Sequence, residues 1–97
     1  MSEPTSRAPD RDLLLSQHSF PGDYIIKAFG PADAAFRGGV SAAVEAVFSA
    51  SRAQLSERVS AKGGKVCITA VLRAETVDEV IEVYDRLYAV ADLKMIL

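Results

Sequence analysis

The sequence predicts one small α+β domain, in which an antiparallel sheet of four strands carries two helices on one of its faces. The first observation is length, since 97 residues suffice for one domain and not for two. The second is periodicity, because segments that alternate apolar and polar residues, as strands do, are interspersed with segments that repeat every three or four residues, as helices do. The third is order. The segments run strand, helix, strand, strand, helix, strand, and each strand-helix-strand half can close with a right-handed crossover.

The first predicted strand extends from Tyr24 to Phe29 and ends at Gly30. Successive side chains of a strand point to opposite faces, so this segment presents two different sets of residues. We expect the helices to cover Tyr24, Ile26 and Ala28, and to leave Ile25, Lys27 and Phe29 on the open face.

The residues before this strand show neither the alternation of a strand nor the three- and four-residue repeat of a helix. Residues 1–17 combine proline, serine and charged residues, which predicts a flexible N-terminal tail ahead of a single domain over residues 18–97. Leu13, Leu14 and Leu15 are the exception, and they could dock on the domain as a short extra element.

The first predicted helix runs from Ala32 to about Ala50, with Pro31 in its first turn. Its apolar stripe consists of Phe36, Val40, Ala43, Val44, Val47 and Phe48. Gly38 and Gly39 weaken the start of this helix, because each glycine costs up to about 1 kcal/mol relative to alanine in a helix interior.

A second strand over residues 53–61 is predicted at an edge of the sheet, because one of its faces is entirely polar. The following Lys62-Gly63-Gly64-Lys65 predicts a hairpin, since glycine adopts positive φ without a Cβ clash. The third strand, from Val66 to Arg73, is the most apolar and is expected at the centre of the sheet beside the first. We expect its covered face to hold Val66, Ile68, Ala70 and Leu72, and its open face Cys67, Thr69, Val71 and Arg73.

The second predicted helix begins at Thr76, because Thr76-Val77-Asp78-Glu79 has the capping-box form. Its apolar stripe consists of Val77, Val80, Ile81, Tyr84, Leu87 and Tyr88. A short final strand is predicted over residues 93–97. We expect Leu93, Met95 and Leu97 in the core and Ile96 on the open face.

This order of elements defines a ferredoxin-like sandwich, and the residues themselves resemble a known family. The shared features are Phe20-Pro21, Tyr24, Lys27, Gly30, the lysine-glycine hairpin, Ile68-Thr69-Ala70-Val71, Tyr84-Asp85-Arg86-Leu87 and Lys94-Met95-Ile96-Leu97. From Phe20 to Leu97 the chain resembles the YbeD-like domain-of-unknown-function family of bacterial proteins. The resemblance implies a ferredoxin-like fold, similar to the ACT regulatory domains that bind amino acids beside metabolic enzymes, and no assigned activity. In ACT domains a glycine follows the first strand where the loop meets the ligand, and Gly30 has the matching position.

Composition argues against several functional classes. A net charge of −2 predicts no general affinity for nucleic acid. The single cysteine, Cys67, can form neither an intramolecular disulfide nor a cysteine zinc cluster, and we expect no metal and no cofactor. No apolar run has the form of a signal peptide or a membrane span, so we expect a cytoplasmic protein without a membrane partner. As a nucleophile Cys67 would need a neighbouring base, but the one histidine, His18, lies at the end of the predicted tail, so no catalytic residue is expected.

The favoured hypothesis is a non-enzymatic binding or regulatory domain that uses its open sheet face to contact a protein partner or a second copy of itself. The expected contact residues are Ile25, Phe29, Cys67, Thr69, Val71 and Ile96, which surround Lys27.

The alternative hypothesis is an ACT-like sensor of a small metabolite, in which Lys27 contacts an anion and Gly30 lets the ligand approach the backbone. Both residues also have simpler interpretations, namely a solvated lysine and a glycine at a corner that requires positive φ. An acylphosphatase-type enzyme would share the topology, but the first loop has no arginine-bearing phosphate cradle. RNA binding is disfavoured, because only Phe29 offers a ring for base stacking on the open face.

Overall fold

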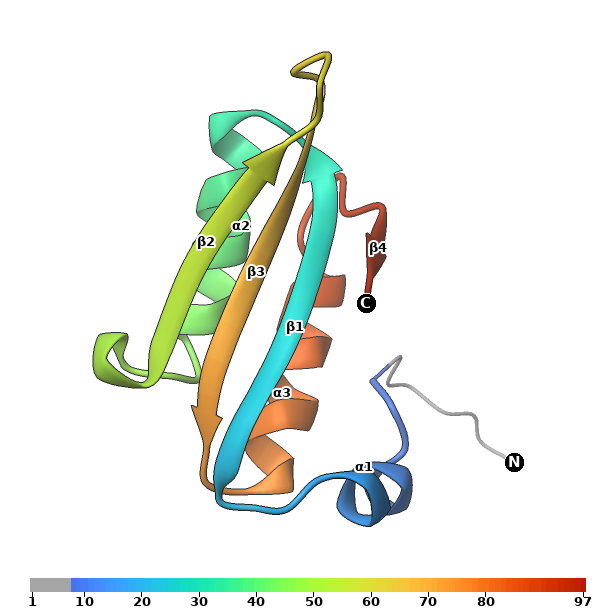
Figure 1. Cartoon of the computed structure of the whole chain (residues 1–97), viewed down its shortest axis with the longest axis vertical. Coiled ribbons are helices and arrows are strands. Elements are labelled where there is room, and N and C mark those ends of the chain that lie inside the picture. Colours follow the sequence, from blue (N-terminus) through green and yellow to red (C-terminus); the bar gives the residue numbers. More distant parts are fainter. Residues whose placement is uncertain (1–7) are drawn as a thin grey trace.

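Two ten-residue strands, β1 (Gly22–Pro31) and β3 (Lys65–Ala74), form the centre of the sheet in the computed structural model, which describes residues 8–97. They pair antiparallel along their whole length, from Gly22 opposite Ala74 to Pro31 opposite Lys65. β2 (Ala53–Val59) pairs with the outer side of β3, and β4 (Met95–Ile96) pairs with the outer side of β1. The strand order is therefore β2-β3-β1-β4, with the first and third strands at the centre as expected (Figure 1).

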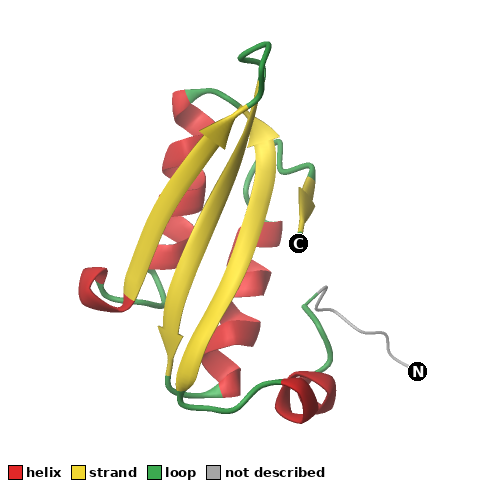
Figure 2. Cartoon of the chain, in the orientation of Figure 1, coloured by secondary structure: helices red, strands yellow, loops and turns green. Residues whose placement is uncertain are grey.

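The helices form a second layer behind this sheet. The described residues contain three α-helices, α1 (Arg11–Gln17), α2 (Ala34–Glu45) and α3 (Val77–Tyr88), together with a short 3-10 helix, η1 (Ala50–Arg52). Figure 2 shows α2 and α3 side by side on one face of the sheet, while no helix of the described residues crosses the other face. The molecule is thus a mixed α/β domain with a four-stranded antiparallel sheet.

The bounds of α2 differ from the prediction of a helix over residues 32–50. Pro31 is the last residue of β1 and not part of the helix, because β1 stays paired with β3 up to the pair of Pro31 with Lys65. The side chain of Asp33 caps the helix by accepting a hydrogen bond from the Phe36 amide at 2.7 Å. The helix ends at Glu45, and η1 then carries the chain towards β2.

The core lies between the two layers and contains most of the predicted residues. The covered faces of the central strands are buried, with Tyr24, Ile26, Ala28, Val66, Ile68, Ala70 and Leu72 all in the core. From α2 and α3 they meet Phe36, Val40, Val44, Val80, Val83, Tyr84 and Leu87. The hydroxyls of Tyr24 and Tyr84 are 3.0 Å apart, so each buried hydroxyl has a hydrogen-bonding partner. Burial is the main reason that the pKa of Tyr84 is raised, and the hydrogen bond with Tyr24 raises it further.

The C-terminal strand was assigned to the wrong faces by the sequence. Ile96 lies opposite Ala28 and packs against the core, whereas Met95 lies opposite Phe29 and is 47% exposed. Leu93, expected in the core, is only partly buried, and Leu97 is exposed. The reason is that β4 consists of Met95–Ile96 alone, so alternation counted from Leu93 does not continue into it.

The prediction of a flexible tail over residues 1–17 is wrong for residues 11–17, which form α1; residues 1–7 lie outside the described residues. The Asp10 carboxylate accepts hydrogen bonds from the amides of Asp12 and Leu13, which starts the helix. α1 packs against α3, with Leu14 buried and Arg11 paired with Asp78 at 2.6 Å. Of the three leucines, Leu14 alone reaches the core, because Leu13 and Leu15 lie on the exposed side of the helix.

A polar cluster joins the ends of β3, η1 and α3. Arg52 donates to the backbone carbonyl of Arg73 and, at 2.7 Å, to the carboxylate of Glu79. The same carboxylate accepts from the Glu75 amide, and Thr76 caps α3 by accepting from the Glu79 amide. The predicted capping box is therefore present in modified form, since Glu79 binds the residue before the cap. The hydrogen bond from Arg52 is the main reason that the pKa of Glu79 lies below its ordinary value of 4.5.

We expect neighbouring residues of β1 to differ sharply in their effect on stability. Ile26→Ala should lower the free energy of unfolding by about 2 to 5 kcal/mol, because it opens a cavity in the core. Ile25→Ala should change it by about 0.5 kcal/mol or less, because that side chain is 56% exposed. Urea denaturation followed by circular dichroism measures both, and equal losses would contradict the assignment of the two faces.

A second pair of substitutions tests the docking of α1. Leu14→Ala should lower the free energy of unfolding by about 2 kcal/mol, the low end of the range for a buried leucine, because α1 is short and peripheral. Leu13→Ala is the control and should change stability by about 0.5 kcal/mol at most, since Leu13 is exposed. If the two variants unfold at the same urea concentration as the parent chain, α1 does not contribute to the domain.

Candidate functional site

The face of the sheet opposite α2 and α3 faces the viewer in Figure 1. Paired residues of an antiparallel sheet share a face, so the register determines which side chains lie there. We define the open face as Ile25, Lys27, Phe29, Lys65, Cys67, Thr69, Val71, Arg73, Gln54, Ser56, Arg58, Met95 and Leu97, with Asp23 at its lower end.

Apolar side chains occupy two rows of this face. In one row Ile25 lies opposite Val71, and in the other Phe29 lies between Cys67 on β3 and Met95 on β4. Ile25 and Met95 are largely exposed, and Phe29, Cys67 and Val71 are half-buried against their neighbours. The rows are about 13 Å apart, four residues along a strand. Apolar side chains are therefore presented to solvent at two separated points on the central strands.

The polar row between them contains Lys27 opposite Thr69, with Ser56 on the outer strand. Leu97 borders this row, because it exchanges two backbone hydrogen bonds with Lys27. Among the predicted contact residues, Thr69 thus lies in the centre of the face as expected. Ile96 does not belong to the face, and Met95 and Leu97 take its place for the reason given above.

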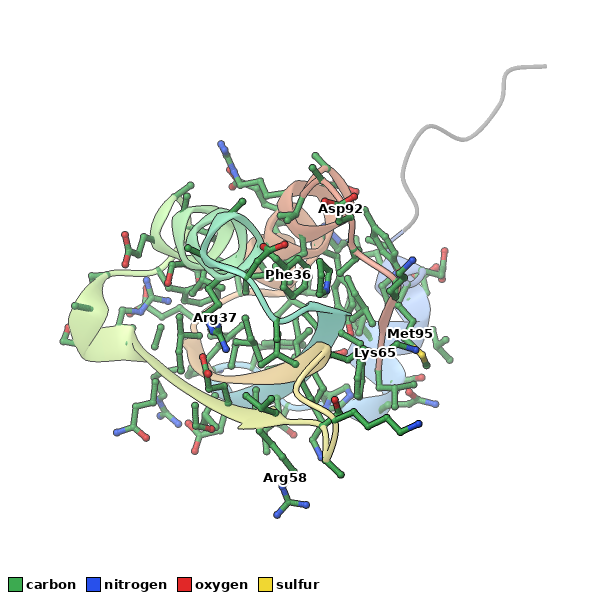
Figure 3. All side chains as sticks on the ribbon, turned by 90° about the horizontal axis from the view of Figure 1, so that it is seen from above. Phe36, Arg37, Arg58, Lys65, Asp92 and Met95 are labelled. Carbon is green, nitrogen blue, oxygen red and sulfur yellow. The ribbon has the colours of Figure 1, made fainter. Side chains whose placement is uncertain are left out.

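Three cations on the open face have no ion-pair partner within residues 8–97: Lys27, Arg58 and Lys65. Figure 3 shows the Arg58 side chain directed away from the helix layer. The remaining cation, Arg73, is close to Asp23, with 3.5 Å between their nearest charged atoms. A sequence with a net charge of −2 therefore folds with a basic open face.

Four cations, Arg52, Arg58, Lys62 and Lys65, lie along the segment from η1 through β2 and the hairpin to the start of β3. Arg52 is neutralised by Glu79. Arg58 and Lys65 belong to the open face, and strand alternation from the covered residues Val59 and Val66 would have been enough to find them. For Met95 and Leu97 the sequence contains no equivalent signal.

The structure separates the two residues predicted to bind a metabolite. Lys27 lies on the open face, whereas Gly30 is three residues further along β1 and is buried on the covered face. A Cβ at Gly30 would lie 2.5 Å from the Phe36 ring, which fills the space next to this backbone. Gly30 also has no positive φ; among the described glycines only Gly63, in the hairpin, has one. The glycine is required at this point because an aromatic ring packs on it.

Cys67 has no base beside it. It lies opposite Phe29 on one side and Arg58 on the other, and its thiol is free. The ring of His18 packs against Tyr24 at a tilt of 56°, with 4.6 Å between the ring centroids, on the other face of the sheet. Within residues 8–97 no group of three or more histidine, cysteine or carboxylate side chains is arranged to hold a metal ion.

Two hollows among residues 8–97 lie outside the apolar rows of the open face, and neither was predicted. A groove of about 450 Å³ runs between α2 and α3 on the outer side of the helix layer, lined mainly by alanines together with Gly39, Val90 and Arg86. A second hollow, of about 390 Å³, lies at the hairpin beside Lys62 and Lys65. In the part of the chain that the structure describes, no helix has the length and apolar character needed to cross a membrane.

Comparison with known proteins gives one match. The family described as "Protein of unknown function (DUF493)" matches residues 16–97, which include every strand and the two helices that cover the sheet. No curated protein and no solved structure matches the chain.

The close packing at Gly30 gives a test of the covered face. Gly30→Ala should lower the free energy of unfolding by about 1 to 3 kcal/mol, because the added methyl group overlaps the buried Phe36 ring. Gly64→Ala is the matched control and should be nearly neutral, since nothing lies within 4 Å of the added Cβ and φ there is not positive. Thermal and urea unfolding measure both variants. A neutral Gly30→Ala would mean that a ligand could enter beside this residue.

Proposed function

Because the chain belongs to the DUF493 family, whose description assigns no activity, we propose its function from the open face: it is a small binding or regulatory domain that contacts a protein partner or a second copy of itself through this face. The single observation that carries the proposal is the exposure of Ile25 and Met95 beside Phe29 and Val71 on a face that no helix covers. Exposed apolar side chains rimmed by polar residues, as in these two rows, mark interaction sites in soluble proteins.

The proposal includes a ferredoxin-like architecture. Its support is the sequence order β1-α2-β2-β3-α3-β4 combined with the spatial order β2-β3-β1-β4. α1 is then an addition that precedes the first strand. Folds of this type host many unrelated activities, so the architecture alone does not favour one function.

A non-enzymatic role in the cytoplasm completes the proposal. Its support is chemical, because the Cys67 thiol lies between Phe29 and Arg58 without a histidine beside it, and a single free cysteine suits a reducing compartment. The alternative of an ACT-like metabolite sensor has less support, since Lys27 and Gly30 lie on opposite faces and Phe36 fills the space at Gly30.

The double variant Phe29→Glu with Val71→Glu tests the proposed function. Both residues lie outside the helix-covered core, so the domain should stay folded, while two carboxylates replace the apolar side chains at the centre of the face. Proteins captured from a cell lysate by the parent chain, and any self-association seen by sedimentation at high concentration, should be lost.

The matched control adds the same charge elsewhere, with Ala34→Glu and Ala35→Glu in the exposed first turn of α2. This control should retain every association of the parent chain, because carboxylates near a helix N-terminus are tolerated. Circular dichroism verifies the fold of each variant, and Ile25→Glu, at a more exposed position, replaces the double variant if the latter unfolds. Associations that persist in a folded open-face variant would contradict the proposal.

A further inference from the structure

We propose that the open face binds an acidic amphipathic helix of another protein rather than a second copy of this chain. The inference deepens the proposed function and rests on it. Its starting point is the contrast between an acidic chain, with a net charge of −2, and a face on which Lys27, Arg58 and Lys65 have no anionic partner within the described residues.

Within residues 8–97, the arginines outside the open face already have anionic partners. Arg11, Arg37, Arg52 and Arg86 each form an ion pair with a carboxylate of the helix layer or of β2. On the open face the one such pair joins Arg73 and Asp23, at the lower end. Lys27 therefore lies between the two apolar rows, Arg58 lies beside the row of Phe29, and Lys65 lies two residues beyond that row along β3. A partner that covers these rows must also supply carboxylates.

A second copy does not meet this requirement. A two-fold dimer formed by open faces would place the same patch against itself and bring Lys27 and Arg58 close to their symmetry mates. Like charges in a contact that excludes water are strongly unfavourable. The acidic side of α3 offers carboxylates, but its apolar residues Val80, Val83 and Leu87 are buried in the core and cannot contact another molecule.

The spacing of the apolar rows fits a helix lying along β1. Ile25 and Phe29 are about 13 Å apart, since each strand residue advances about 3.3 Å. On an α-helix, residues seven apart differ by only about 20° around the axis and are separated by about 10.5 Å, while residues eight apart are separated by about 12 Å and still belong to one apolar stripe about 100° wide. A helix with apolar residues at this spacing would contact both rows, and acidic residues beside its stripe would reach Lys27 between the rows and Arg58 at the β2 side.

Single-stranded RNA is the other polyanion that a basic sheet face could accept. Such binding depends on rings on which successive bases stack. Within the described part of the open face, Phe29 is the one aromatic residue, and it is half-buried. The apolar rows therefore suit leucine-like side chains better than a run of bases.

The test uses the full chain and two synthetic amphipathic helical peptides of about 18 residues, long enough for both rows. Both carry the same leucine stripe, flanked by glutamate in one and by lysine in the other. We expect the glutamate peptide to bind and to shift the amide signals of β1 and β3 in a ¹⁵N titration. Its affinity should fall as the sodium chloride concentration is raised. The lysine peptide should not bind at the same concentrations.

Two double variants distinguish the effect of charge on the open face from the effect of the overall charge of the chain. The double variant Lys27→Gln with Arg58→Gln should raise the Kd of the glutamate peptide about tenfold. The double variant Arg11→Gln with Arg86→Gln removes the same charge from the helix layer, and it should change this Kd less than about twofold. The proposal is overturned if neither peptide binds, if both bind equally, or if the two double variants lose affinity for the glutamate peptide by the same factor. Tighter binding of an oligouridine, or dimerisation through this face at low salt, also overturns it.

These outcomes distinguish the two levels of inference. If Phe29→Glu with Val71→Glu abolishes associations while Lys27→Gln with Arg58→Gln does not, the open face is still the binding surface and only the acidic partner is wrong. If the glutamate peptide shifts signals of α2 and α3 instead of the sheet, both the acidic partner on the open face and the proposed function fail.

Discussion

Ten residue pairs join β1 to β3, from Gly22 with Ala74 to Pro31 with Lys65, and the two residues of each pair point to the same side of the sheet. This register decides both surfaces of the domain. Ile26 opposite Ala70 belongs to the core, and Ile25 opposite Val71 belongs to the open face. A slip by one residue would exchange the two sets, placing Lys27 under the helices without a partner for its charge. Packing of α2 and α3 therefore depends on this one alignment.

The helix layer is held against the central strands by contacts at both ends. At the hairpin end, the Phe36 ring packs directly on the backbone of Gly30, so α2 approaches β1 more closely than any side chain at that position would allow. At the other end, Arg52 connects the carbonyl of Arg73 to Glu79 at the start of α3. The Tyr24–Tyr84 hydroxyl pair satisfies two polar atoms in the core, and α1 adds Leu14 beside α3. All of these contacts lie on the helix side of the sheet, and no element of the described residues covers the opposite face.

Charge is distributed unevenly because of this layered arrangement. The acidic residues of α3 lie on the solvent side of the helix layer, and several of them pair with arginines. The strands contribute lysine and arginine at positions that alternation directs to the open face. The open face combines exposed apolar side chains with three cations that have no ion-pair partner within residues 8–97, and this combination distinguishes it from a sheet face that is merely solvated.

The sequence by itself determined the two strand faces of β1 and β3, the hairpin at Gly63, the start of α3 at Thr76 and the family, because these depend on alternation, helical period and local turn chemistry. Only the tertiary structure decided the rest. The faces of Met95 and Ile96 follow from pairing with Phe29 and Ala28, the docking of Leu14 follows from α3, and the role of Gly30 follows from Phe36. Each of these depends on a neighbour distant in sequence, which no local pattern of a short segment encodes.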